Sequence, residues 1–335
     1  MAGRHHRTFR TPQLNPTRSG YDARMSPTRR MWIDTDTASD DVVAIVMALK
    51  HPSTEVVGMS IVIGNVPVEL GVQNALYTNE MCGKSIPVHA GAEMPLVRPF
   101  ATAQHVHGAD GMGDIGLPLK GRKATSNNAV HEMIEAFRKE PGDLELVALG
   151  PLTNLALAIR IEPKFARWVK RCVIMGGTGV LPGNITPLAE FNWWVDPEAV
   201  HIVLESGMKV EMVGWDVSVA DAVIEDDLAA ELRALGPLGR YSIDIQRVLR
   251  KFCEESSKLK GFDWPDPIAM AVALEPDIAS SEAHRRVEVS LGLGHERGQT
   301  IVDHLGNTKR EPNCRVVYRV DRTRFIDMIR NSFRA

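Results

Sequence analysis

Cysteine is scarce in this chain of 335 residues, and long apolar runs are lacking. Cys82, Cys172, Cys253 and Cys314 lie far apart and form no Cys-x-x-Cys pair, which argues against a disulfide framework and a zinc site. No apolar run reaches the roughly 18 residues that a membrane span needs. The formal net charge is only −3, so no basic field attracts nucleic acid. These absences favour a cytoplasmic protein with reduced thiols and no membrane or nucleic-acid partner.

The first thirty residues differ in composition from the rest of the chain. They hold seven arginines, one acid (Asp22) and no apolar stretch, whereas a secretory signal requires a hydrophobic middle. We interpret residues 1–30 as a disordered extension, with Met25 as an alternative start. An organelle transit peptide is the other interpretation. Residues 31–335 are expected to form a single domain.

From Met31 onward, short apolar runs alternate with longer segments of helical periodicity. Strand–helix alternation predicts right-handed crossovers and an open, mainly parallel sheet flanked by helices, which is an α/β fold. A polar helical cap is expected at 220–260, and a small antiparallel addition at 285–293, 299–304 and 314–320. The other expected strands are 30–34, 55–64, 87–92, 144–150, 171–177 and 209–218, and the other expected helices are 39–52, 68–83, 127–142, 151–169, 196–207, 265–276 and 322–333.

The stretch DTDTASDD, residues 34–41, places four carboxylates directly behind the first expected strand. Ligands of open parallel sheets bind beyond the carboxyl ends of the strands. Four close carboxylates repel one another unless a cation lies among them. Capping of the next helix could explain Asp40 and Asp41, but it leaves Asp34 and Asp36 unexplained. Oxygen ligands without His or Cys select a hard ion, and calcium tolerates irregular geometry better than magnesium.

A second interpretation of the same stretch is phosphoryl transfer. Asp-x-Asp-x-Thr after an apolar strand is similar to the haloacid-dehalogenase phosphatases, in which Asp34 would be the nucleophile and Asp36 the acid/base. Asp40 and Asp41, so close behind, are the first sign against that interpretation. The choice between a cation site and a phosphatase site therefore depends on the motifs in the rest of the chain.

Five further segments resemble the inosine–uridine-type nucleoside hydrolases, whose opening motif is Asp-x-Asp-Pro-Gly-x-Asp-Asp. Here Thr37 and Ala38 replace Pro and Gly. The segments are VIGN ending at Asn65, HGADGMG at 107–113, GPLTNLALA at 150–158, MGGTGVLPGNITPLAEFNWWVDPEA at 175–199 and DPIAMAVAL at 266–274. The resemblance runs from about residue 30 to the C-terminus. It implies a Rossmann-like fold and hydrolysis of the N-glycosidic bond of ribonucleosides.

The resemblance also implies a Ca²⁺ site and roles for individual residues. Asp36 would be a metal ligand and the general base for metal-bound water, which Asn65 would help orient. The other metal ligands would be Asp41, Asp266 and the Leu149 carbonyl, with Asp34 nearby. The residues expected to bind substrate are Asp40 and Asn192 at the ribose 2′-hydroxyl, Asn184 and Glu190 at the 5′-hydroxyl, and His107, Met175, Phe191 and Trp264 along the pocket.

One departure from the family pattern concerns the leaving base. Many members have His immediately before the last motif's Asp, where it can protonate the base, but this chain has Pro265. Trp264 could instead stack on the base, with simple packing as its alternative, and His107 could be either a substrate contact or a surface histidine. The preferred base is therefore left open. Trp193 and Trp194 are expected to pack.

Three functions are weighed on these grounds. A calcium-dependent ribonucleoside hydrolase accounts for every motif. A haloacid-dehalogenase-type phosphatase does not account for AEFN at 189–192 or the distant Asp-Pro, and a nucleoside- or ribose-binding protein without turnover does not require the full ligand set. By analogy with the family, a homodimer or homotetramer is expected.

Overall fold

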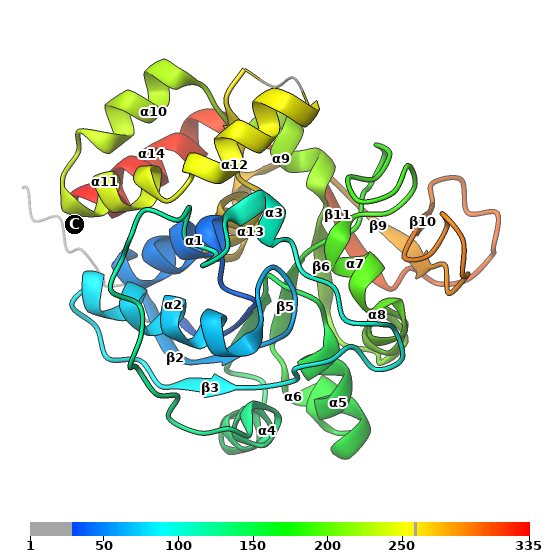
Figure 1. Cartoon of the computed structure of the whole chain (residues 1–335). Coiled ribbons are helices and arrows are strands. Elements are labelled where there is room, and N and C mark those ends of the chain that lie inside the picture. The colour runs from blue at the N-terminus through cyan, green and yellow to red at the C-terminus, as the bar shows by residue number, and fades with distance from the viewer. Residues whose placement is uncertain (1–28, 258–259) are drawn as a thin grey trace, which may run out of the picture.

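A nine-stranded sheet forms the centre of the structure, in the order β10-β9-β11-β6-β5-β4-β1-β2-β3 (Figure 1). The structure is a computed structural model that describes residues 29–257 and 260–335. The neighbouring strands from β11 to β3 are all parallel, which confirms the predicted sheet. They are β1 (Arg29–Thr35), β2 (Thr54–Ile61), β3 (Val88–Ala90), β4 (Glu145–Ala148), β5 (Arg171–Met175), β6 (Val210–Val213) and β11 (Cys314–Val320).

The predicted antiparallel addition lies at one edge of this sheet. β9 (Ala279–Val289) runs antiparallel to both β10 (Thr300–Asp303) and β11. β11 itself pairs in parallel with β6, so the expectation for residues 314–320 is right for one edge of the strand and wrong for the other. A separate antiparallel pair is formed by β7 (Val223–Ile224) and β8 (Phe262–Asp263).

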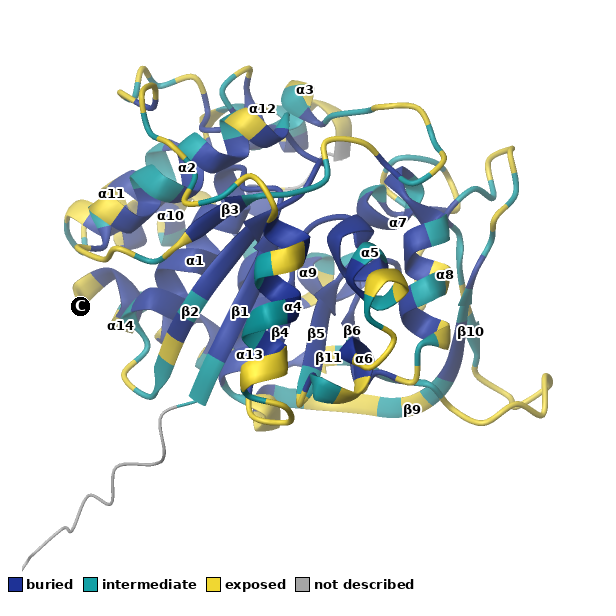
Figure 2. Cartoon of the chain, turned by 90° about the horizontal axis from the view of Figure 1, so that it is seen from below, coloured by how far each residue is buried: buried dark blue, intermediate teal, exposed yellow. Residues whose placement is uncertain are grey.

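Helices cover both faces of the sheet because the strands are apolar on both faces. Met31 and Ile33 belong to one buried cluster and Trp32 to the other, since successive side chains of a strand point to opposite faces. Figure 2 shows the central strands buried over most of their length. The first cluster includes residues of α1 (Ser39–Lys50), α2 (Val68–Met81), α9 (Trp215–Asp221), α10 (Asp226–Arg233), α11 (Pro237–Asp244), α12 (Arg247–Phe252), α13 (Pro265–Leu274) and α14 (Arg322–Arg334), and the second those of α4 (Ala129–Lys139), α5 (Thr153–Ile161), α6 (Phe165–Trp168) and α8 (Pro197–Glu205).

α1 and α13 are buried around their whole circumference. Every residue of α1 from Ser39 to Leu49, and of α13 from Asp266 to Leu274, is buried. The two helices pack against each other, and α11 and α14 pack against α1. A helix that is apolar on all sides is typical of such a position. The acidic residues in the first turns of α1 and α13 are therefore held away from water.

Three local expectations are corrected by the structure. The helix expected at 151–169 is two helices, α5 and α6, because Pro163 disfavours the helical conformation of Glu162, which is extended. The strand expected at 209–218 ends at Val213, and α9 follows it. Arg29 and Arg30, which fall within the expected extension, begin β1, and residues 1–28 lie outside the described residues. The proposed start at Met25 lies outside the described residues.

The order in which successive strands are added to the sheet reverses at β1. From β1 the chain continues outward through β2 to β3, then returns to the other side of β1 to form β4, β5 and β6. Such a switch point, between β1 and β4, opens a crevice at the carboxyl ends of the strands and is where open α/β sheets bind ligands. The short helices α3 (Gln104–His107) and α7 (Phe191–Val195) and the π-helix η1 (Cys253–Ser257) lie in the connections, and the 3₁₀ turn η2 (Pro276–Ile278) precedes β9.

Candidate active site

The aspartates that follow β1 are buried and held in place by backbone groups. Asp36 accepts a hydrogen bond from the Asn65 backbone N–H at 2.5 Å. Asp41 accepts from the Ala38 backbone N–H at 2.9 Å and from the Thr35 hydroxyl at 2.5 Å. α1 begins at Ser39, so Ala38 is its N-cap residue, and the Ala38 N–H donates to Asp41. The connection between β1 and α1 is thus organised around carboxylates.

Tertiary packing brings a distant carboxylate to this group. Asp266, in the first turn of α13, lies with Asp40 and Asp41 such that one oxygen from each falls within 4.8 Å of the others. All three are buried. Because α1 and α13 pack side by side, their amino-terminal turns present these carboxylates to the same point. Helix amino termini favour negative charge there, but each supplies only a partial positive charge.

Burial and mutual repulsion raise the pKa of this whole group of carboxyls. Burial raises the pKa of Asp40 to about 7 and that of Asp41 to about 6. The pKa values of Asp36 and Asp266 lie well above the ordinary range, first because of burial and then because of the charge of Asp41. No lysine or arginine of the described segments forms an ion pair with any of them; His107 is the one titratable base beside them, 3.6 Å from Asp40.

The donor set fits a divalent cation. Within the described part of the chain, Asp36 Oδ1 and Asp40 Oδ1 are buried without a hydrogen-bond partner, as is Asp34 Oδ2. A buried oxygen without a partner is costly, and a cation would satisfy it. The oxygens available in this cluster belong to carboxylates, which hard ions prefer as ligands. This cluster is therefore a candidate divalent-metal site, which we call the metal site.

Asp34 is fully buried, and its environment differs from that of the other aspartates. It accepts hydrogen bonds from the Ser60 hydroxyl and, at 2.8 Å, from the Asn154 side-chain amide. Burial raises its pKa to about 7. Ser60 in turn accepts from the Trp32 indole at 2.9 Å. Through these hydrogen bonds Asp34 links β1 to β2 and α5.

A pocket of about 300 Å³ opens above the carboxylates, a volume in the range of small-molecule sites. Its wall contains residues from nine segments that lie far apart in the sequence. Asp36, Asp41 and Asp34 lie beneath this wall, fully buried. Of the residues expected in the site, Asp40, Asn65, His107, Leu149, Met175, Asn184, Glu190, Phe191, Asn192 and Asp266 line the pocket.

The segment from Asn184 to Asn192 forms one side of the pocket. Glu190 precedes α7 and accepts from the backbone N–H groups of Gly177 and Asn192, each at 2.9 Å. Burial raises the Glu190 pKa to about 7. The Asn192 amide donates to the Leu149 carbonyl at 2.8 Å, and Asn184 accepts from the Phe191 N–H at 3.0 Å. These polar side chains are therefore fixed before any ligand arrives.

His107 is a buried residue and not the surface histidine of the alternative interpretation. Its Nδ1 lies 2.9 Å from the Ser39 hydroxyl and 3.6 Å from Asp40. Burial lowers the His107 pKa to about 4, so the ring is neutral near pH 7. The ring therefore lies beside Asp40 as a neutral hydrogen-bonding group.

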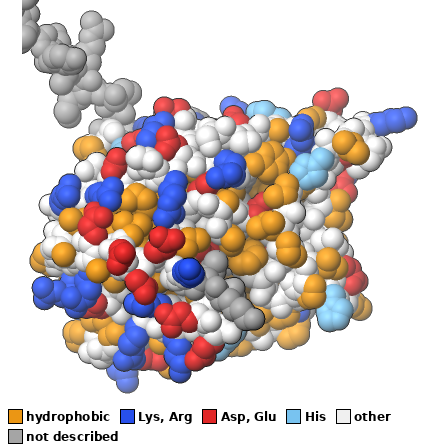
Figure 3. All heavy atoms as spheres, turned by 90° about the horizontal axis from the view of Figure 1, so that it is seen from above, with side chains coloured by type: hydrophobic (Ala, Val, Ile, Leu, Met, Phe, Trp, Pro, Cys, Tyr) orange, Lys and Arg blue, Asp and Glu red, His pale blue; other side chains and the backbone are white. Residues whose placement is uncertain are grey.

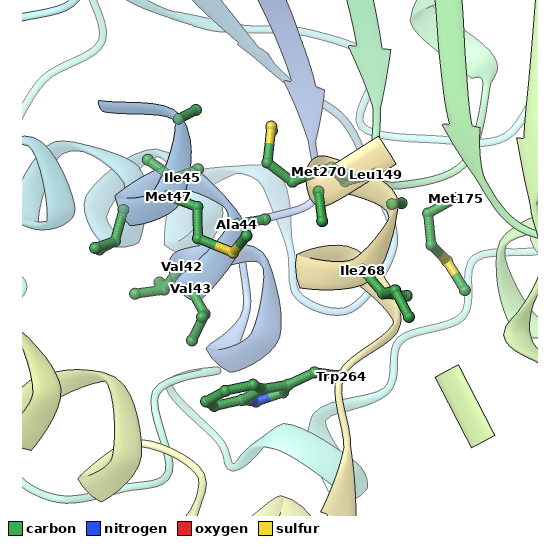
Figure 4. Close-up of a cluster of buried hydrophobic side chains, with 14 of the residues drawn as sticks. Val42, Val43, Ala44, Ile45, Met47, Leu149, Met175, Trp264, Ile268 and Met270 are labelled. Carbon is green, nitrogen blue, oxygen red and sulfur yellow. The ribbon is translucent and has the colours of Figure 1, made fainter. Parts of the chain in front are cut away.

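Trp264 does not reach the pocket. The indole is fully buried, and Figure 4 shows it beside α1 within the cluster of apolar side chains. It packs edge-to-face on Phe262 at a ring distance of 5.5 Å. Of the two interpretations of Trp264, the structure favours packing over stacking on a base, because the turn into α13 directs Trp264 inward and leaves Pro265 on the pocket wall. Trp193 is likewise fully buried.

Sequence reasoning missed one whole wall of the pocket. Part of it comes from α3 and α12, in connections that carry no recognisable motif apart from the His-Gly at 107–108. The side chains concerned include His105, Trp215, Leu249, Phe252 and Asp263. Only the proximity of His105 to the HGADGMG segment could have pointed to this wall.

An open parallel sheet with an oxygen-ligand metal site beneath a small-molecule pocket is typical of metal-dependent α/β enzymes. The family model described as "Inosine-uridine preferring nucleoside hydrolase" matches residues 31–327, and the chain belongs to this family. It is an N-ribohydrolase, an enzyme that hydrolyses the N-glycosidic bond of ribonucleosides. The family match removes the phosphatase interpretation.

Relatives of known structure or activity cover nearly the whole chain. The pyrimidine-specific ribonucleoside hydrolase RihB of Escherichia coli (strain K12) is 34% identical over 308 residues, which are 91% of this chain and 97% of RihB. The plant nucleoside hydrolase PpNRh1 has a TM-score of 0.86 and 30% identity, covering 92% of this chain and 100% of that one. A purine-preferring ribonucleoside hydrolase from Gardnerella vaginalis has a TM-score of 0.84 and 29% identity, covering 91% and 98%.

Proposed function

We propose that this enzyme hydrolyses free ribonucleosides with Asp36 as the general base and Ca²⁺ as the resident cation. The observation that carries this proposal is the state of the Asp36 carboxyl. One of its oxygens is fixed by the Asn65 N–H, and the other is buried without a partner, next to Asp41 and Asp266. A carboxylate oriented in this way can hold a cation and accept a proton from water at the same time.

The proposed ligands of the cation are Asp36, Asp41, Asp266 and the Leu149 carbonyl. Calcium accepts such an irregular set of carboxylate and carbonyl oxygens, whereas magnesium demands near-octahedral geometry. When bound, the cation would hold ribose hydroxyls and lower the pKa of water. The Leu149 carbonyl also accepts a hydrogen bond from the Asn192 side-chain amide. This hydrogen bond would hold Asn192, which is proposed to bind the sugar, next to the cation.

The ribose is proposed to bind along the polar side of the pocket. Asp40 and Asn192 would bind the 2′-hydroxyl, Asn184 and Glu190 the 5′-hydroxyl, and Asn65 would help orient the attacking water. Met175 and Phe191 would line the sugar site, since both face the pocket beside these groups. His107 would contact the substrate through its neutral ring next to Asp40. Each of these groups is already held by hydrogen bonds or packing, which reduces the ordering cost of binding.

The activity is tested by release of free base from a panel of purine and pyrimidine ribonucleosides, with calcium and with chelator. We expect calcium-dependent release from one class of base. RihB is pyrimidine-specific by name and the Gardnerella enzyme purine-preferring, so the panel must hold both classes. Equal turnover in chelator would exclude a metal role, and ribose binding without any release would favour the binding-protein alternative.

Calcium should stabilise the fold more at pH 8 than at pH 5. In the folded protein Asp40 and Asp41 have pKa values of about 7 and 6, above the ordinary 3.8. Without metal, the free energy of unfolding therefore falls as the pH rises from about 4 to 7, because these carboxyls must lose their protons while buried. Deprotonated carboxylates bind a cation better. At 100 times its Kd, calcium would add about 2.7 kcal/mol, a Tm rise of about 5 °C.

The measurement is thermal unfolding with calcium and with chelator at both pH values. The readout is the difference in Tm between the calcium sample and the chelator sample at each pH. The lowered pKa of His107 also destabilises the fold below pH 6.5, but it does so equally in both samples and cancels in this difference. A calcium-induced shift that is equal at pH 5 and pH 8 would contradict the carboxylate site.

Three wider properties remain proposals. We propose that residues 31–335 act as one catalytic domain, a span close to the family match at 31–327. A cytoplasmic location is supported by Cys82, Cys172 and Cys314, which are buried and form no disulfide in the described part of the chain. A homodimer or homotetramer is proposed by analogy with the family, and light scattering would measure it.

No helix in the described ranges is long and apolar enough to cross a membrane. On the face in Figure 3, basic and acidic side chains are interspersed rather than grouped by sign. Such a surface does not form the basic stripe that binds a nucleic-acid strand. The proposed partner is a free nucleoside, which the family match supports.

A further inference from the structure

The lining of the pocket is of two chemical kinds, and we call the parts that they form the sugar half and the base half. The metal site and the residues proposed to bind ribose form one half, as described above. The other half includes apolar and aromatic side chains of Val106, Trp215, Leu249 and Phe252. A planar base prefers such an apolar, aromatic surface, so the sugar in the first half directs the base into the second.

Cleavage of the N-glycosidic bond needs a proton for the departing base, and few groups on this wall can supply one. Pro265 has no proton to donate. Asp263 accepts a hydrogen bond from the Ser218 hydroxyl at 2.6 Å, and both oxygens of Glu190 accept from backbone N–H groups. These carboxyls are arranged as acceptors. Cys253 and Ser256 also line the pocket, but a thiol and a hydroxyl are weaker acids than an imidazolium, so the remaining candidates are His105 and His107.

The two imidazoles have different environments. His107 is buried and engaged with Ser39, beside Asp40 on the sugar half of the pocket. His105 is exposed to solvent and lines the base half. Its ring packs edge-to-face on Phe252, with the ring centroids 5.8 Å apart, and no hydrogen bond engages its nitrogens within the described ranges. α3 and α12, which carry the two rings, lie against each other (Figure 1).

We propose that His105 is the general acid that protonates the leaving base. The proposal rests on the N-ribohydrolase function proposed above. Water forms the new bond to C1′ and gives a proton to Asp36, while the C1′–N bond breaks and its electron pair stays with the base. The His105 N–H donates a proton to a heteroatom of that base. Exchange with solvent returns Asp36 and His105 to their starting states.

Imidazole is suited to this step because it can gain and lose a proton near neutral pH. Solvent exposure lets the ring regain its proton after each turnover, whereas the packing against Phe252 holds it at the base half of the pocket. Phe252 is thereby assigned a positioning role. The structure thus supplies from α3 the proton donor that the family pattern would place at residue 265.

The test compares two leaving groups in the holoenzyme with calcium. One is a natural ribonucleoside cleaved by the wild type, and the other is 4-nitrophenyl riboside, whose nitrophenolate leaves without a proton. We expect H105Q and H105F to reduce kcat for the nucleoside by about 10²–10³-fold and to leave kcat for the nitrophenyl riboside within about twofold. H105F keeps an aromatic ring against Phe252, so it separates the loss of the proton from the loss of packing. The matched control is H131Q, at an exposed histidine of α4 on the other side of the sheet.

Two outcomes would overturn the proposal. Unchanged nucleoside turnover in both His105 variants would show that another group donates the proton. An equal loss on both substrates would show that His105 acts on folding or binding and not on the leaving group. A wild type that cleaves neither substrate would instead contradict the proposed N-ribohydrolase function, so the two failures are distinguishable.

Discussion

Replacing Asp36 with Asn should reduce kcat/KM for ribonucleosides by about 10²–10⁴-fold, and by more if metal affinity also falls. Asn has nearly the same shape, and its oxygen can still accept from the Asn65 N–H. It cannot accept a proton from water, and it brings no negative charge to a cation. The loss should therefore appear mainly in kcat at saturating calcium.

The same variant should be more stable than the wild type when both are held in chelator. Asp36 is fully buried, and the charge of Asp41 is the second cause, after burial, of its strongly raised pKa. Removing a desolvated like charge relieves that repulsion. We expect a Tm higher by a few degrees at pH 8 in chelator, with a smaller calcium-induced rise.

Steady-state kinetics and thermal unfolding measure the two effects on the same samples. D143N, at an exposed site between α4 and β4, is the matched control and should change neither. Activity of D36N within tenfold of the wild type would rule out Asp36 as the general base. A lower Tm in chelator would show that its charge is compensated by a group that we have not identified.

Substituting Gly64 with Ala should abolish most activity without touching an ionisable group. A Cβ at Gly64 would lie 2.0 Å from Asp36 Oδ2, and one at Gly150 would lie 2.7 Å from Asp36 Oδ1. Neither glycine has a positive φ, so Ala suits the backbone and the conflict is with the carboxylate. Displacing a catalytic group by about 1 Å can cost about 10²-fold in rate.

G58A is the control for general steric strain. Its Cβ would meet the Trp32 ring at 2.4 Å, inside the core of the sheet. We expect G58A to lower Tm while the folded fraction keeps its kcat, whereas G64A and G150A should lose kcat and calcium affinity together. Calorimetric titration with calcium provides the second readout. Retention of wild-type kcat in G64A would show that the carboxylate can move aside without consequence.

Much of the fold could be predicted because its signals are local. β1 and α1 are short apolar segments on either side of DTDTASDD, and the alternation of strands and helices is enough to predict a parallel sheet. The one long helix expected at 151–169 was wrong for a local reason, because Pro163 disfavours a helical conformation at Glu162 and α5 ends at Ile161. The carboxyl edge of β1 was predictable for the same reason, since chain direction alone puts Asp34 and Asp36 there.

The sequence by itself determined the four clustered aspartates, the oxygen-only ligand chemistry and, through its motifs, the family. Only the tertiary structure decided that Asp266 lies within 4.8 Å of Asp40 and Asp41, that Trp264 faces the core, and that α3 and α12 close the base half of the pocket. The physical reason is that these contacts join segments far apart in the chain. Which side chain faces the pocket depends on how two helices pack against each other, and no local periodicity encodes that packing.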